Sequence, residues 1–455
     1  MATKAEVRQA LLDKQKELIA SATNLKDIAY ITKAIADTQK IIDSSGLAVL
    51  DLNTPYGVMY DPDTEEYFQL GHGVPVIQQR MKRVVCTGNP NFGGTVYKYL
   101  DAKDSTKYTD GTSAVADVNG STGKQVYVEV PKYYTKKYAI GSQQFKLMSL
   151  LPFDGATTDI LFRKTGWSDT GDGTDVLHEM SHSYFSAFEN VQYDASANAF
   201  VDGTGVAPTL DLVADKLMSV SGYKPCTVIT RAQARTLIAN GGGKQFNIHQ
   251  WSALLDLFEV EFLTKNSQSV LSGYTEKTTG ATYLGNVVRT GLTLSLGNET
   301  GTITGKPSDF GGTDTGTFVI ANSYRGIENP FGHLWQFVDG ININNGIPYL
   351  INTVDLPFAD NIGTGDYTQA KDSDGNFIVL PTISDKYIAR QHNGTNFPNL
   401  LYGNTITNCG DNYWYATGWR VLLSGADLTG GSLAGLSAWN GSVASSSSNW
   451  YICGR

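Results

Sequence analysis

Short runs of strand-forming residues, each closed by a turn signal, constrain most strongly what this 455-residue chain can fold into. From about residue 46 to 125, the runs GVMYD, EYFQLG, RVVCTG and TVYKYL alternate with Gly, Asn, Asp and Pro. The segment VYVEVPKYY, which begins at Val126, alternates most clearly. Because 48 glycines and 24 tyrosines accompany only 17% charged residues, the composition favours a rigid scaffold rich in strands and loops.

Helical periodicity is predicted for two parts of the chain. Over residues 4–43, apolar side chains recur at spacings of three, four and seven, and a cap near residues 21–24 indicates two helices. So narrow an apolar stripe needs a partner, and it fits a packed helical hairpin and an oligomeric coiled coil equally well. Further along, RAQARTLIANGG predicts a helix that ends at its glycines, and NIHQWSALLDLFEVEFLTKN predicts another with an apolar face.

Charge and cysteine usage exclude several classes of protein. The net charge of −9 and the lack of Lys/Arg clusters argue against a nucleic-acid partner. The charged, amphipathic N-terminus predicts no secretory signal, and the absence of long apolar stretches predicts no membrane insertion. The four cysteines lack the spacing of a disulfide framework or a zinc knuckle, so we expect free thiols; they are Cys86, Cys226, Cys409 and Cys453.

The segment HEMSH, with His178, Glu179 and His182, matches the H-E-x-x-H pattern of zinc proteases. That chemistry requires a helix, because both imidazoles must share one face with the glutamate beside the metal-bound water. The preceding SDTGDGTDV is typical of a turn, and the following SHSYFSAFENVQY alternates like a strand. We therefore interpret HEMSH as a turn that leads into a strand.

Two acidic segments are similar to calcium-binding loops. DTGDGTD contains Asp169, Asp172 and Asp175, and DSDGN contains Asp372, Asp374 and Asn376. Neither has the full ligand spacing or the closing glutamate of a calcium loop. Asp-Gly turns give the same letters, so we predict turns, with a structural calcium ion as the alternative and no other cofactor. The chain also lacks a G-x-S-x-G elbow and a phosphate-binding G-x-x-x-x-G-K-[ST] loop, so no catalytic motif is predicted.

The C-terminal part of the chain is almost uncharged. After Arg420, only Asp427 and Arg455 carry a formal side-chain charge, and Ser, Gly, Ala, Leu, Asn, Thr, Trp and Tyr predominate. Antibody contact surfaces use the same residues, because Tyr and Trp supply rigid area while Ser, Asn and Gly supply adaptable hydrogen bonds. A solvated loop explains the serines equally well. The apolar WYIC near the end favours a closing strand that pins such a surface to the core.

Several of these segments resemble a known family. TGWRVLLSGADLTGGSLAGLSAWN and NWYICGR resemble the variable region of proteins diversified by diversity-generating retroelements, of the major tropism determinant type. In that family, a C-type-lectin-like domain ends with GWR, a glycine-punctuated variable stretch and a short closing segment. Upstream, FNIHQWSALLDLFEVEFLTKNSQS, YRGIENPFGHLWQFVDGININN and RMKRVVCTGNPNFGGTVYKYLDAKDSTKY resemble phage tail proteins with this fold. Formylglycine-generating enzymes share the fold.

The resemblance implies an α+β protein with three parts. An N-terminal helical oligomerisation or attachment segment is expected over residues 1–45, and a β-rich intermediate domain over 46–124. A C-type-lectin-like (formylglycine-generating-enzyme-like) receptor-binding domain is expected over 125–455, with its variable region at about 420–455. The resemblance also implies a homotrimer in the phage tail of the virion, assembled in the host cytoplasm. Its implied partners are a bacterial cell-surface receptor, protein or glycan, and other tail proteins bound through the N-terminal segment.

The residues expected to contact the receptor lie between positions 427 and 451. Aromatic side chains are expected to act as anchors, and Ser, Asn and Thr as adjustable polar contacts. Five neighbouring residues are expected to be scaffold instead: Gly418, Trp419, Arg420, Gly425 and Gly435. The expected contacts are Asp427, Leu428, Thr429, Ser432, Leu433, Ser437, Trp439, Asn440, Ser442, Asn449, Trp450 and Tyr451.

Two other functions stay open on the same fold, a metal-dependent enzyme and an inert structural tail component. The enzyme would use His178 and His182, or Cys409 and Cys453, as ligands. Formylglycine-generating enzymes have two closely spaced cysteines, whereas these cysteines lie far apart in the chain. Calcium-dependent sugar binding needs an acidic residue after Trp-Asn, where this chain has Gly441. The first departure argues against the enzyme and the second against a calcium-dependent lectin, so we expect a binding protein that is not an enzyme.

Overall fold

The computed structural model of the chain describes residue 13 and residues 54–455 with several gaps. Apart from residue 13, the predicted N-terminal helices over 4–43 lie outside the described residues, as do the acidic segments 169–174 and 372–376 and Cys409. Antiparallel strands predominate in the described chain and helices are few, which confirms the α+β class. The gaps comprise residues 62, 154, 169–174, 176, 274–279, 317–318, 352, 362–366, 371–378, 380–410 and 412.

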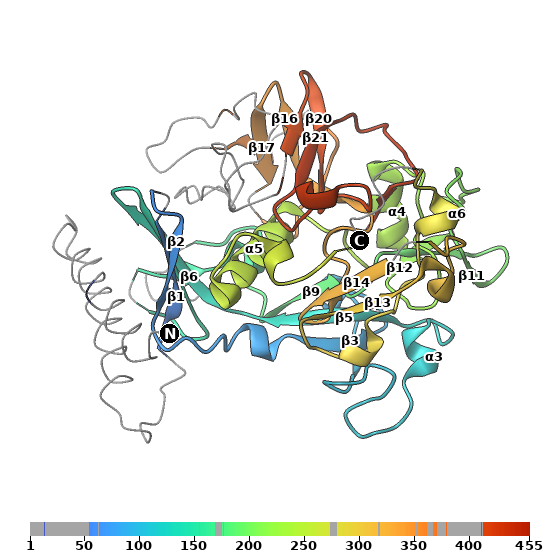
Figure 1. The fold of residues 1–455 in the computed structure, drawn as a ribbon, viewed down its shortest axis with the longest axis horizontal. Coiled ribbons are helices and arrows are strands. Elements are labelled where there is room, and N and C mark those ends of the chain that lie inside the picture. The colour runs from blue at the N-terminus through green and yellow to red at the C-terminus, as the bar shows by residue number, and fades with distance from the viewer. Residues whose placement is uncertain are drawn as a thin grey trace. The chain divides into compact units, whose positions relative to one another are not determined.

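The chain divides into two compact units. The first consists of residues 1–80, 131–181 and 256–264, and its described part contains a five-stranded antiparallel sheet. Apolar side chains from neighbouring strands, including Met59 and Phe145, meet across this sheet and are buried. The strand order is β2 (Glu66–Leu70), β1 (Tyr56–Asp61), β7 (Gln143–Ser149), β6 (Tyr134–Ile140) and β8 (Thr157–Thr158), as labelled in part in Figure 1.

Buried ion pairs attach the end of helix α5 (Ile248–Phe262) to this sheet. The helix belongs to the first unit from Asp256 onward. Lys146 on β7 pairs with Asp256 at 2.5 Å and also with Glu259, and Lys137 on β6 pairs with Asp256. Positions 256 and 259 lie on one face of the helix because they are three residues apart. Charges of both signs therefore fix the helix to the strands.

The second unit consists of residues 81–130, 182–255 and 265–455. Its described part includes three smaller sheets, and the strongest strand pattern of the sequence, at Val126, lies in one of them. Their strand orders are β4 (Val96–Tyr99), β3 (Lys82–Cys86), β5 (Gln125–Pro131), β9 (His182–Ser186); β11 (Ala199–Val201), β10 (Val191–Asp194), β12 (Lys216–Met218); and β13 (Gly301–Gly305), β14 (Val319–Tyr324), β15 (Ile327–Glu328).

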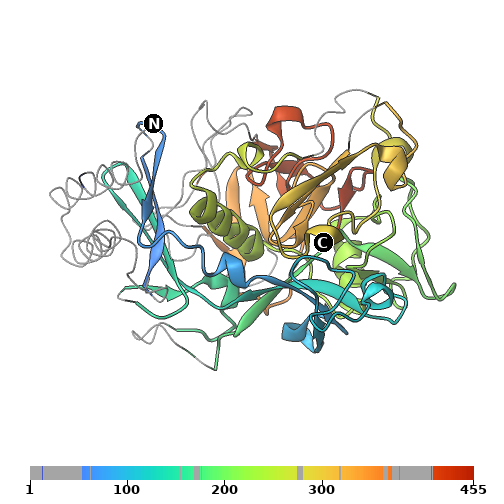
Figure 2. The same ribbon diagram turned by 60° about the horizontal axis from the view of Figure 1, so that its bottom comes forward.

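A larger sheet of the second unit carries the C-terminal strands. Its central strand β16 (Trp335–Asn344) pairs at Gln336 with both Ser424 and Cys453, so two strands lie on its opposite edges. The described strands follow the order β18 (Tyr367–Gln369), β17 (Ile347–Ile351), β16, β20 (Trp419–Ser424), β21 (Trp439–Val443) and β19 (Tyr413–Tyr415), with β22 (Ile452–Cys453) parallel to β16. The orange-to-red strands of Figures 1 and 2 show this arrangement.

Helix α4 (Arg231–Asn240) follows from local sequence signals. The hydroxyl of Thr230 accepts a hydrogen bond from the backbone of Gln233, whose side chain accepts one from Thr230 in return. This reciprocal cap satisfies two donors that a helix start leaves free. The helix ends before Gly241, as predicted. The predicted second helix is α5, and the described residues also include the short helices α3 (Val115–Val118) and α6 (Tyr283–Asn286).

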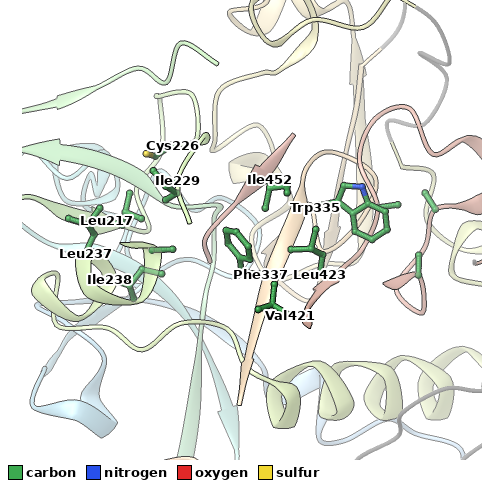
Figure 3. Close-up of a cluster of buried hydrophobic side chains, with 14 residues drawn as sticks. Leu217, Cys226, Ile229, Leu237, Ile238, Trp335, Phe337, Val421, Leu423 and Ile452 are labelled. Atoms are coloured by element: carbon green, nitrogen blue, oxygen red, sulfur yellow. The ribbon is translucent and has the colours of Figure 1, made fainter. Parts of the chain in front are cut away.

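The C-terminal strand contributes to a buried core of the second unit. In Figure 3, Ile452 of β22 lies among side chains that include Phe337 of β16 and Leu423 of β20. Leu237 and Ile238 of α4 belong to the same cluster. Full burial of one such side chain contributes about 1.5–3 kcal/mol. The closing strand predicted from WYIC is therefore part of the core.

The predicted domain boundaries at residues 45 and 124 stay predictions. Segment 46–124 supplies β1 and β2 to the first unit and β3 and β4 to the second. Within the described ranges, none of the helices is long and apolar enough to cross a membrane.

Candidate functional site

The HEMSH segment forms a turn followed by a strand, which confirms the interpretation from sequence. His178 lies in the turn, with its Nδ1 3.0 Å from a carboxylate oxygen of Asp175, and His182 begins β9. Glu179 accepts hydrogen bonds from Lys132 at 3.0 Å and from Trp167 at 2.9 Å. In the part of the chain that the structure describes, no group of three or more His, Cys, Asp and Glu side chains could hold a metal ion.

The candidate site is the closing segment, residues 425–451, which connects β20 to β22. Its backbone is fixed at both ends. Gly425 donates a hydrogen bond to Ala438 at 2.9 Å and accepts one from Gly332 at 3.0 Å. At the other end, Asn449 accepts from Val228 and Tyr451 accepts from Trp335 through their backbone carbonyls.

The backbone conformation at the start of the closing segment requires a glycine at position 425. Its φ angle of 91° lies in the left-handed region that favours glycine. A Cβ at this position would also lie 2.9 Å from the carbonyl oxygen of Pro330. Gly425 is thus scaffold, since a larger residue would move the segment.

Four of the expected contact residues are buried in the fold. Leu428 packs in an apolar cluster with Leu334 and Cys453. Strand alternation turns Trp439 of β21 inward, whereas the next residue is partly exposed. The exposed fractions are 0% for Leu428 and Trp439, 3% for Ser437 and 7% for Asp427. In this conformation they offer almost no surface to a partner, and we reassign them from contacts to scaffold.

The other eight expected residues reach the surface of the chain. Because Asp427 is the single formal charge of the closing segment and is buried, the exposed part of the segment is uncharged. Thr429, Ser432 and Ser442 are exposed; Leu433, Asn440, Asn449, Trp450 and Tyr451 are partly exposed.

Asp427 organises one group of these residues. Its Oδ1 accepts hydrogen bonds from the backbone N–H of Thr429 at 2.8 Å and from the Thr429 hydroxyl at 2.6 Å. Burial raises the pKa of Asp427, and the hydrogen bonds from Thr429 and Trp335 only partly offset this effect. Burial and the nearby Asp427 raise the pKa of Tyr451. The rings of Trp450 and Tyr451 meet edge to face at 5.6 Å.

A second group, Asn440 and Ser442, repeats the same local motif on β21. The Asn440 Oδ1 accepts a hydrogen bond from the Ser442 N–H at 2.8 Å and another from its hydroxyl at 2.6 Å. Short polar side chains form such bonds to the backbone two residues on. The exposed hydroxyls of Thr429 and Ser442 are therefore held in position by their own neighbours.

Sequence reasoning missed the residues that support the middle of the closing segment. Gln268 donates a hydrogen bond to the carbonyl of Gly431 at 3.1 Å and another to Ala434. Trp251 Nε1 donates to the carbonyl of Leu436 at 2.9 Å. Both donors come from a distant stretch of chain that gives no local signal of this role.

Asp411 is a further support that the sequence analysis did not single out. Its carboxyl group is fully buried and accepts a hydrogen bond from the Ser437 N–H at 2.9 Å. One signal was available, because Asp411 is the single Asp, Glu, Lys or Arg between Arg390 and Arg420. An isolated acid in an uncharged stretch of a folded domain often has a structural partner.

Comparisons with known proteins add no relative: no protein-family model matches the sequence, and no curated protein matches it. The function is consequently inferred from the sequence resemblance and from the geometry of the closing segment.

Proposed function

We propose that this chain is a receptor-binding protein of a phage tail tip or fibre, which attaches to a bacterial surface receptor through the closing segment. One observation carries the proposal: uncharged polar and aromatic side chains are presented on a backbone that the core fixes at both ends. Such a backbone loses little conformational freedom on binding. Its exposed positions accept substitution because their side chains are not part of the core.

The exposed chemistry suits recognition of a protein or a glycan. Trp450 and Tyr451 offer half-buried rings that already pack against the fold, so that little side-chain entropy is lost when a partner covers them. Thr429 and Ser442 offer hydroxyls whose positions are set by neighbouring side chains. We assign the aromatic residues as anchors and the hydroxyl groups as polar contacts that neighbouring side chains hold in position.

The finer fold and the assembly belong to the same proposal. We assign the domain around the larger sheet to the C-type-lectin-like class, supported by its central β16, its closing β22 and the adjacent α4. The N-terminal segment would join three chains and attach them to other tail proteins in the virion. Three copies of the surface would raise a weak single-site affinity by factors of about 10²–10⁴. The proposal invokes no cofactor and no enzymatic step.

Charge substitution on the surface tests the proposal. The triple variant T429K/S432K/S442K of the full chain places three positive charges on exposed positions of the closing segment. Fluorescently labelled wild type is screened against a panel of bacterial strains by flow cytometry. On a strain that it stains, we expect the variant to lose at least about tenfold in affinity, because a contact surface cannot easily bury unpaired charge.

A matched control carries the same added charge elsewhere in the second unit. T204K/T304K/S308K alters three other exposed hydroxyl residues. We expect it to bind like wild type, and both variants to keep the wild-type unfolding midpoint. Equal staining by wild type and the closing-segment variant would overturn the assignment of the surface.

The retroelement part of the proposal is tested on DNA. We expect the gene to be followed by an imperfect copy of its 3′ end and by a reverse-transcriptase gene. The two copies should differ mainly at adenines of the template. A locus without these features would remove diversification and leave a receptor-binding role with a fixed surface.

A further inference from the structure

Asp411 contacts Gly435 and Ser437, which follow Ser432 and Leu433 in the same turn of the closing segment. Its Oδ2 accepts the hydrogen bond from the Ser437 N–H, whereas its Oδ1 has no hydrogen-bond partner among the residues that the structure describes. Gly435 packs directly on the carboxyl group, and a Cβ at Gly435 would overlap both carboxyl oxygens. The turn is thus shaped around this one side chain.

Among the described residues, none supplies a compensating charge to Asp411. Across the described residues, no lysine, arginine or histidine forms an ion pair with Asp411. The turn that faces it, residues 430–438, contains no titratable side chain. Asp427, the single acid of the closing segment, has its own partners in Thr429 and Trp335. An ionised carboxylate with one hydrogen bond and no cation is costly in a dry site, so the neutral acid is favoured.

We propose that Asp411 is a positioning residue, which holds the turn at Gly435 and Ser437 as an uncharged carboxylic acid. A proton on Oδ1 leaves Oδ2 free to accept the Ser437 N–H, so the neutral acid keeps the observed bond. Loss of that proton places a bare charge beneath the turn and loosens it. Consequently the surface around Ser432 and Leu433 is ordered while Asp411 stays protonated. The effect on attachment rests on the proposed function; the effect on the turn does not.

The direction of the proton equilibrium agrees with this geometry. Burial raises the pKa of Asp411 well above its ordinary value, and the Ser437 N–H offsets only part of that rise. For an acid with a raised pKa, the native state holds more protons than the unfolded chain between the two pKa values. The stability of the turn therefore falls as the pH increases through that window.

Amide hydrogen exchange of the full chain tests the proposal in two variants. Asp411→Asn keeps the shape and an acceptor oxygen without an ionisable group, whereas Asp411→Ala removes the acceptor. Exchange is followed by mass spectrometry on peptides that cover residues 431–438, and rates are corrected for the intrinsic effect of pH. The strand β20, residues 419–424, serves as the internal reference.

In wild type we expect protection of 431–438 to fall with rising pH relative to β20, and in Asp411→Asn we expect it to stay constant. Asp411→Ala should exchange about fivefold faster than Asp411→Asn at every pH, as expected for the loss of one ordinary hydrogen bond. A wild type and an Asn variant with the same pH dependence would overturn the proposal. So would an Asn variant that exchanges as fast as the Ala variant.

The same proteins separate this inference from the proposed function. Exchange needs no receptor, so it reports on Asp411 even where no strain is stained. If exchange behaves as expected while the lysine variant of the closing segment still stains cells, the positioning role stands and the receptor surface lies elsewhere. If staining is lost but exchange is independent of Asp411, the receptor surface stands and the positioning role fails.

Discussion

Two buried carboxyl groups, Asp256 in the first compact unit and Asp411 in the second, have opposite surroundings. In the first unit, Asp256 is paired with Lys137 and Lys146, and both lysines come from the sheet. In the second, Asp411 has one backbone amide and no cationic partner among the described residues. A paired buried ion fixes two elements firmly but cannot lose one member cheaply. A neutral acid supports a turn without adding charge to the surface above it.

The largest expected effect comes from removing a lysine of the buried ion pairs in the first unit. Lys146→Met removes the buried cation that pairs with both Asp256 and Glu259, so we expect a loss of about 3–5 kcal/mol in the free energy of unfolding. Urea denaturation, followed through the unfolding transition of the first unit, measures this loss of stability. Lys107→Met, which removes a more exposed partner of Asp104, is the control and should leave the transition unchanged. A loss below about 1 kcal/mol for Lys146→Met would show that the pair adds little.

An intermediate effect is expected from filling the space beside the neutral acid. Gly435→Ala puts a methyl group against the Asp411 carboxyl, and overpacking of this kind costs about 1–3 kcal/mol. Asp411→Ala creates room for that methyl group, so the double variant should be more stable than the sum of the two single changes predicts. Urea unfolding of the four proteins in this cycle gives the coupling free energy. Strict additivity would mean that the two residues do not touch in solution.

The smallest expected effect is a change in how steeply the free energy of unfolding depends on pH. Burial raises the pKa of Asp427, so the native state holds more protons than the unfolded chain from about pH 4 up to the folded pKa. Wild-type stability falls across that window, and Asp427→Asn removes this contribution while keeping an acceptor for Thr429. Urea unfolding from pH 4 to 8 should therefore favour the variant increasingly as the pH rises. A constant difference between the two proteins would contradict the raised pKa.

Much of the local structure could be predicted from sequence because its signals are local. The turn after each β-type run fixes where β1 to β4 end, and the cap at Thr230 fixes where α4 begins. The turn at HEMSH and the final strand at Ile452 follow from patterns of the same kind. These features depend on a few consecutive residues.

The division of the closing segment into scaffold and surface could not be predicted in the same way. Trp439 and Trp450 lie in the same almost uncharged segment and were both predicted to contact the receptor. The register of β21 against β20 buries only Trp439. The roles of Trp251 and Asp411 depend on residues far away in the chain. Long-range pairing decides which side chains face the core, and a single sequence does not encode that pairing locally.

The closing segment leaves one edge of β16 after Ser424 and returns to the opposite edge at Ile452. Two strand spacings, about 10 Å, therefore separate its ends whatever lies between them. Lengthening such a connection is cheap, since doubling a flexible loop costs only about 0.6 kcal/mol in closure entropy. The turn near Ser446, which is exposed, could accept extra residues without disturbing either strand. The closing segment can therefore vary in length as well as in the chemistry of its exposed side chains.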